Sequence, residues 1–209
     1  MWTDMSEIVR PTRDGIHGRE FISTVTDIGY KPNALCFNAN GQFGGPRPEL
    51  ISIPLPILFD AASPALAHPA LWQSAAQAAA ELGSLAILPL PAILDQGLQG
   101  GHIVPVVKTG DELHLAALNA PRLIALDGWD AELYAWLRQT FPHSILGLRL
   151  PFEASEQLLA YVRMGVHVFH FLTDFHGRDP GGKFVLDLIR SVHSVFVQAG
   201  IREEVTLLG

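Results

Sequence analysis

The feature that most constrains the fold is an alternation of short apolar runs with helix-like segments from residue 51 onward. The apolar runs cover residues 51–61, 85–90, 102–109, 122–128, 144–151, 166–175 and 204–209, and the helix-like segments cover 68–83, 109–120, 129–141, 155–165 and 183–200. Such alternation is typical of parallel strands joined by right-handed crossovers. The sequence therefore predicts an α/β fold with seven parallel strands.

Two architectures satisfy this pattern, a TIM-type (β/α) barrel and an open doubly wound sheet. The even spacing of the strands favours the barrel. A standard barrel has eight strands, whereas the seventh predicted strand ends at Gly209. We therefore expect an incomplete barrel over residues 51–209: either a truncated piece of a longer protein, or a barrel whose gap the N-terminal region or a partner chain covers. Unpaired edge strands invite pairing, which predicts a homodimer through the open edge.

Residues 1–50 differ in composition and form the predicted N-terminal arm. They are richer in Gly, Pro, Asn and charged residues, as is typical of loops and linkers. Residues 34–39 are a candidate for one short strand within the arm. Cys36 has no identifiable base beside it, so the sequence predicts a buried, inert thiol.

Composition excludes several classes of protein. A chain that is 48% hydrophobic and 17% charged can bury the core of one domain, and it is unlike a disordered chain. The net charge of −7 and the scattered Lys and Arg residues argue against a nucleic-acid-binding surface. No apolar run is long enough for a membrane span, and the N-terminus has no secretory signal pattern. The single cysteine excludes an internal disulfide, so a cytoplasmic protein is expected.

Polar residues gather where the predicted strands end. In a barrel, ligands lie at the carboxyl ends of the strands. The residues at these ends are Asp60, Ser63, Lys108, Thr109, Asp127, Arg149, Thr173, Asp174, His176 and Gly209. The sequence therefore predicts one functional face, although polar residues also begin wherever a buried strand ends.

The segment 171–184, "FLTDFHGRDPGGKF", offers the most specific candidate loop. Gly181 and Gly182 precede a helix expected to start near Lys183, so free backbone N–H groups and the helix dipole would favour an anion, above all a phosphate. Arg178 would add positive charge. The same residues also suit a simple tight turn.

Three residues near the sixth predicted strand could instead hold a metal ion. His170 and Asp174 share one face of the strand by its period of two, and His176 follows closely. A metal-dependent hydrolase is the function this would imply. Histidines packed in the core or at the rim are the favoured interpretation, because no second ligand cluster accompanies them.

Two long segments resemble a known family. Residues 51–88 resemble the start of the FMN-binding barrel domain of glutamate synthase, in which a first strand leads into a Ser-containing loop, an Ala-rich helix and a second strand. Residues 166–209 resemble that domain's later strand, Gly-rich loop, helix and next strand. The resemblance covers about residues 50–209 and depends on order and spacing in a shortened, degenerate form of the domain.

The resemblance implies a bound FMN across the barrel mouth. It places the loop Ala61, Ala62 and Ser63 against the flavin, and Arg149 where the family has a lysine near the ring. It also places Gly177, Gly181 and Gly182 in the Gly-rich loop, and Gly209 at the start of the phosphate-binding turn. Together with Lys108, Asp174 and Arg178, these are the predicted cofactor-binding residues.

The sequence leaves two main hypotheses for the function. A lone cysteine cannot ligate the family's iron–sulfur cluster, so the first hypothesis is a flavin-dependent oxidoreductase without that cluster, in which Arg149 or Lys108 stabilises negative charge on the reduced ring. The alternative is a non-catalytic scaffold or assembly protein derived from a barrel that has lost its cofactor.

Overall fold

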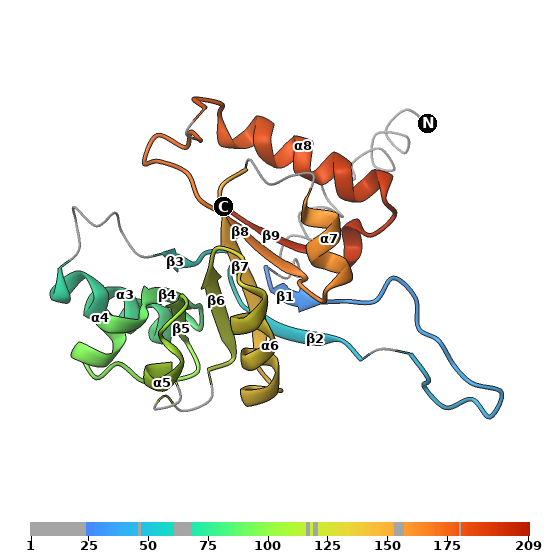
Figure 1. Ribbon diagram of the computed structural model, residues 1–209, viewed down its shortest axis with the longest axis horizontal. Helices are drawn as coiled ribbons and strands as arrows, with labels where there is room; N and C mark the ends of the chain where they lie inside the picture. Colours follow the sequence, from blue (N-terminus) through green and yellow to red (C-terminus); the bar gives the residue numbers. More distant parts are fainter. Residues whose placement is uncertain are drawn as a thin grey trace, which may run out of the picture.

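The core of the molecule is a curled sheet of seven parallel strands that forms a half-barrel (Figure 1). The computed structural model describes residues 24–45, 47–60, 68–115, 118, 121–152, 157–179 and 181–209. The strands are β3 (Phe59–Asp60), β4 (Ala86–Pro89), β5 (Ile103–Val107), β6 (Leu123–Asp127), β7 (Ile145–Leu150), β8 (Val168–Phe171) and β9 (Thr206–Leu208). They lie in the order of the sequence, without the reversal that defines a doubly wound sheet. The predicted parallel α/β alternation is confirmed.

Helices cover the convex face of this sheet. They are α3 (Pro69–Leu82), α4 (Leu90–Asp95), α5 (Glu112–Leu115), α6 (Ala131–Thr140), α7 (Leu158–Arg163), α8 (Val185–Gln198) and the short 3₁₀-helix η3 (Arg202–Glu204). The outward residues of the central strands, such as Leu126 and Leu148, share one apolar cluster with Leu137 of α6 and Phe196 of α8. No helix among the described residues is long and apolar enough to cross a membrane.

Local sequence signals explain where the principal helices begin and end. The Asp130 carboxylate accepts hydrogen bonds from the N–H groups of Glu132 and Leu133 and so caps α6. At α3, the His68 ring accepts from the Ala70 N–H. Gly83 then ends α3 with a left-handed φ of 66°.

The first predicted strand, residues 51–61, is wrong as a single element. It is divided into β2 (Glu49–Ile53) and the two-residue strand β3, because Pro54 and Pro56 lie between them and cannot donate ladder hydrogen bonds. The strand β2 pairs antiparallel with β1 (Thr26–Tyr30). Residues 34–39 contain no strand and contribute only an isolated bridge between Phe37 and Phe43. The helix α4 was not predicted.

The β1–β2 hairpin packs against the concave face of the half-barrel. Ile28, Ile51 and Ile53 of the hairpin are buried with inward residues of the sheet, among them Val104 and Ile145. The boundary predicted between residues 50 and 51 therefore falls inside β2, and the hairpin and the sheet share one core. The described strand residues of the predicted arm therefore pack on the inside of the half-barrel, which is a different place from the gap between the edge strands.

Close backbone approach fixes the position of the hairpin. The Gly29 N–H donates to the Thr206 hydroxyl at 3.1 Å, and this hydroxyl donates to the Gly29 carbonyl at 3.2 Å. Gly29 has φ 133°, and a Cβ there would lie 2.0 Å from the Glu49 carbonyl oxygen. Only glycine fits this position without moving the backbone.

Candidate functional site

A cavity of about 340 Å³ lies in the opening between the two edge strands, β3 and β9. Its lining comes from both edges, from β4 and β8, and from the hairpin beneath: Thr26, Ile28, Ile53, Pro56, Leu58, Asp60, Ile87, His170, Phe171, Leu172, Thr173, Thr206, Leu207, Leu208 and Gly209. The walls are mainly apolar, and a few polar groups converge at the carboxyl ends of the strands. This combination is typical of small-molecule sites.

His170, one of the polar groups of the lining, belongs to a register row that also contains two charged residues of neighbouring strands. Asp127 of β6 is opposite Arg149 of β7, Arg149 is opposite His170 of β8, and His170 is opposite Leu208 of β9. Side chains alternate faces along a strand, and the preceding residues on the same face of these strands, such as Ala125 and Val168, belong to the inner apolar cluster. The row is therefore the layer in which the interior changes from apolar to charged.

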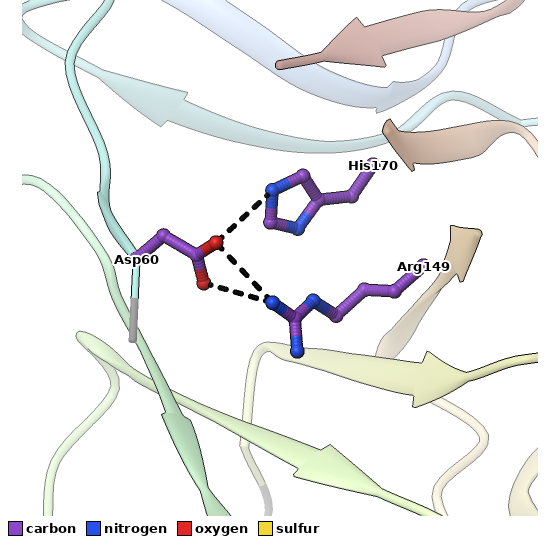
Figure 2. A network of polar contacts seen from close by, with 3 residues as sticks. All are labelled: Asp60, Arg149 and His170. Atoms are coloured by element: carbon purple, nitrogen blue, oxygen red, sulfur yellow. Dashed lines mark hydrogen bonds and ion pairs between the residues drawn. The ribbon is translucent and has the colours of Figure 1, made fainter. Parts of the chain in front are cut away.

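Asp60 joins this row from the opposite side of the half-barrel. One Arg149 Nη atom lies 3.3 Å and 3.2 Å from the two carboxylate oxygens of Asp60. The His170 Nε2 atom lies 3.5 Å from one of the same oxygens. Figure 2 shows the carboxylate between the two basic side chains. Since β3 and β7 are four positions apart in the sheet, only the curl of the half-barrel allows this contact.

Burial determines the electrostatics of the cluster. The side chains of Arg149 and His170 are 12% and 11% exposed, whereas that of Asp60 is 37% exposed. Burial lowers the pKa of His170, and the Arg149 charge lowers it further, while the nearby Asp60 carboxylate acts in the opposite direction. His170 is therefore neutral at pH 7, and the close ion pair is Arg149 with Asp60.

Two buried nitrogen atoms of the cluster have no hydrogen-bond partner among the described residues, Arg149 Nε and His170 Nδ1. A buried polar atom without a partner costs about 1–3 kcal/mol, so native proteins rarely leave one without a reason. Of the two residues only His170 lines the cavity, and an unsatisfied group there is typical of a site that meets a ligand or an ordered water.

The structure places some of the predicted site residues at the cavity and others away from it. Gly209 lies in the cavity lining. Arg149 is absent from the lining and is connected to the cavity through its ion pair with Asp60, which does line it. Ala61, Ala62 and Ser63 lie outside the described residues. Lys108 follows β5 and is exposed, and its backbone N–H donates to the Asp111 carboxylate. Thr109 donates its hydroxyl hydrogen to Asp130. Lys108 is not part of the cavity lining.

The segment 173–184 folds as a loop that satisfies its own hydrogen bonds. The Asp174 carboxylate accepts from the N–H groups of Arg178 and His176, and these bonds lower the pKa of Asp174. The Gly182 N–H donates to the Asp179 carbonyl, and the Lys183 N–H donates to the Asp179 carboxylate.

These bonds correct the prediction of free amides at the Gly-rich loop. The helix α8 begins at Val185 rather than near Lys183, and the Val185 N–H donates to the Gly177 carbonyl. The Arg178 guanidinium donates to the Gly182 carbonyl. Asp174, Gly177, Arg178, Gly181 and Gly182 are all absent from the cavity lining, so the structure favours the tight-turn interpretation of this stretch.

Two further alternatives can be assessed. No group of three or more His, Cys, Asp and Glu residues in the described part of the chain has an arrangement that could hold a metal ion. His170 faces Asp60 and Arg149 instead of forming a ligand set with Asp174 and His176. Cys36 is exposed, so its predicted burial is wrong; it lies in the long connection between β1 and β2, away from any core.

Sequence reasoning missed two of the three residues in the cluster. Asp60 was noted only as a polar strand end, and His170 only as a possible metal ligand. The signal that pairs Arg149 with His170 is their position, because each is the next-to-last residue of its strand and the two strands are neighbours. Nothing in the sequence indicates that Asp60 reaches across the half-barrel.

Comparison of the chain with models of protein families, with characterised proteins and with solved structures finds no match. The function is therefore argued from the geometry of the cavity and its charged cluster.

Proposed function

We propose that the half-barrel is a shortened TIM-type barrel that binds a flat, partly apolar small molecule in the cavity between β3 and β9. The observation that carries this proposal is that Asp60 and His170 line a largely apolar cavity at the carboxyl ends of the strands, with Arg149 paired to Asp60 behind them. In barrels of this type, ligands lie at the carboxyl ends of the strands. FMN, the cofactor of the glutamate synthase family that the sequence resembles, is the first ligand to test.

The cavity suits the ring of FMN better than its phosphate. Ile28, Ile53 and Leu208 provide apolar surfaces for a planar ring, and the volume of about 340 Å³ is near the lower end of the range for ligand sites. The Gly-rich loop expected to hold the phosphate has its Gly182 and Lys183 amides occupied by Asp179. The Arg149 charge is already paired with Asp60. A flavin ring or a similar uncharged heterocycle is therefore favoured over an intact phosphorylated cofactor.

The charged cluster would orient such a ligand. Asp60 fixes one end of the Arg149 guanidinium, and the buried Arg149 Nε–H has no partner in the described structure. The neutral His170 ring can accept or donate one hydrogen bond, depending on its tautomer. These groups would form hydrogen bonds with a carbonyl oxygen or a ring nitrogen at the edge of the ligand. The finer expectation, an FMN-dependent oxidoreductase in the cytoplasm, stays a prediction.

A ligand titration tests the proposal. Riboflavin and FMN would be added to the purified chain, and binding measured by quenching of flavin fluorescence. We expect saturable quenching by riboflavin at least as strong as by FMN, because the ring rather than the phosphate provides the contacts. The variant Leu208→Trp fills the cavity and should abolish quenching, whereas Leu82→Trp, on the exposed side of α3, should not.

A second candidate function follows from the self-bonded loop. If neither flavin binds and the chain is colourless, the barrel-derived scaffold without a cofactor becomes the better account. The occupied amides of the Gly-rich loop are the observation that favours it. Binding of FMN but not of riboflavin would contradict both accounts, because it would require a phosphate site.

A further inference from the structure

The connection between β1 and β2 is much longer than a hairpin needs. Tyr30 ends β1 and Glu49 begins β2, which leaves 18 residues between two directly paired strands. Hairpin loops usually contain 2–5 residues, and longer ones are usually functional. Figure 1 shows this connection extending away from the sheet. The name projecting loop is used below for its described residues, 31–45, 47 and 48.

Hydrogen bonds hold the tip of the projecting loop in one shape. The Asn38 side-chain oxygen accepts from the N–H groups of Asn40 and Gln42, and the Asn38 N–H donates to the Gln42 carbonyl at 2.8 Å. The Gly44 N–H donates to the Cys36 carbonyl. Near its base, Asn33 donates to the Gly200 carbonyl after α8. The loop is thus an ordered extension anchored to the body.

This ordered tip presents apolar side chains to solvent. Leu35 and Phe37 are 62% and 61% exposed, and Phe43 is 37% exposed. The rings of Phe37 and Phe43 pack edge to face with centroids 6.1 Å apart. No described residue of the projecting loop is buried. Rigid, exposed aromatic residues are typical anchors of protein interfaces, because burying them costs little conformational entropy.

The charge of the projecting loop is opposite to that of the rest of the chain. Residues 31–48 contain Lys31 and Arg47 and no acidic residue, a charge of +2. Because the whole chain has a net charge of −7, the remaining residues carry −9. Complementary potentials steer partners together and disfavour contact between like charges. The rest of a second copy carries the opposite net charge, which favours docking of the basic loop on it.

From these observations we propose that the projecting loop docks its aromatic tip on the body of a second copy, in a reciprocal two-fold dimer. Each copy supplies one basic loop and one acidic body, so a closed symmetric pair satisfies both loops. A dimer in which two loops meet directly would bring like charges together. The docking is independent of which ligand fills the cavity.

Sedimentation velocity at increasing protein concentration tests the dimer. The wild-type chain should dimerise, and Phe37→Ser with Phe43→Ser should raise the dimer dissociation constant at least about tenfold, as expected for aromatic anchors. Lys31→Glu with Arg47→Glu should also weaken the dimer, most at low salt. The control is Leu186→Ser with Val197→Ser, two exposed apolar residues of α8. A wild-type monomer at all concentrations, or equal loss in the control, would overturn the proposal.

Cys36 makes the docking surface directly accessible to cross-linking, since it is the single cysteine and is exposed at the tip. Unlabelled chain would carry a photoreactive maleimide on Cys36. It would be mixed with unmodified chain labelled with ¹⁵N, and the cross-linker would then be activated by light. We expect cross-links from the light Cys36 to heavy peptides of the body. Cross-links near β3 or β9 would also support the homodimer expected through the open edge. Cross-links only within one chain, or only between two tips, would refute the reciprocal arrangement.

Discussion

The two ends of the half-barrel interior are built on the same strands but differ in the side chains that occupy them. At the amino end, inward residues such as Leu123 and Ile145 pack against the β1–β2 hairpin in an apolar core. A pocket of about 300 Å³ lies beside this core, lined by residues that include Glu49 and Arg122. At the carboxyl end, the last inward positions of β7 and β8 are Arg149 and His170, and His170 lines the cavity together with Asp60. The amino end is thus held mainly by apolar packing, whereas charged side chains meet at the carboxyl end.

The largest effect is expected where the hairpin meets the sheet. In Gly29→Ala the new Cβ would lie 2.0 Å from the Glu49 carbonyl oxygen and 2.8 Å from Ile145 Cδ1. Either β1 moves away from the concave face or the backbone is strained, and we expect a loss of about 3–4 kcal/mol in the free energy of unfolding. Urea unfolding followed by circular dichroism measures it.

Gly41→Ala is the matched control for this change. Gly41 also has a positive φ, 74°, but no atom lies within 4 Å of the position its Cβ would take. We expect this variant to lose only about 1 kcal/mol in the free energy of unfolding, because alanine disfavours a left-handed backbone conformation. Equal losses in the two variants would mean that the hairpin does not stabilise the amino end through close packing.

The next largest effect is expected at the charged rim. Asp60→Asn removes the carboxylate that faces Arg149, whose side chain is only 12% exposed. A buried charge without its partner is strongly destabilising, but Asp60 is 37% exposed, so the loss should be about 1–2 kcal/mol. Arg149→Met in the same chain should restore part of the loss, because it removes the unpaired charge. Additive losses in the double variant would contradict a direct coupling between the two residues.

Much of the sheet could be predicted from the sequence, because hydrophobic periodicity is a local property of the chain. Six of the seven parallel strands lie where apolar runs indicate them, and the last helix was placed to within two residues. The exception is residues 51–61, where two prolines separate a hairpin strand from a sheet strand within one apolar run. The hydrophobic periodicity of a segment indicates which residues are buried, but it does not indicate which strand the segment pairs with.

The site was less predictable, because it depends on contacts between distant segments. Arg149 was identified from its position at a strand end, whereas the contact of Asp60 with Arg149 and His170 depends on the curl of the sheet. The Gly-rich stretch before α8 left a phosphate site and a tight turn open for a different reason. Asp174 and Asp179 bond the local amides themselves, and such side-chain to backbone competition is common for Asp.

A smaller, pH-dependent effect is expected from two histidines, the buried His170 and the half-buried His167. Burial lowers the pKa of His170 at the rim and of His167 at the start of β8, below the ordinary value of 6.5. These two groups therefore bind protons more readily in the unfolded chain than in the folded one, so their contribution to stability is fully present above pH 6.5 and is lost as the pH decreases below it. Unfolding curves on both sides of this pH should show a shallower fall in His170→Gln and in His167→Gln. An unchanged pH dependence in both variants would show that neither ring is neutral because of burial.

The smallest effect is expected in the loop that the sequence singled out. Gly182 has φ 80° and open space around it, so Gly182→Ala should cost about 1 kcal/mol of stability from backbone preference alone. Because the neighbouring Lys183 amide already bonds to Asp179, the added methyl group displaces no ligand contact. Riboflavin and FMN affinities, measured by fluorescence quenching, should equal those of the wild-type chain. A drop confined to FMN would place its phosphate at this loop and would show that the Asp179 bonds open when the ligand binds.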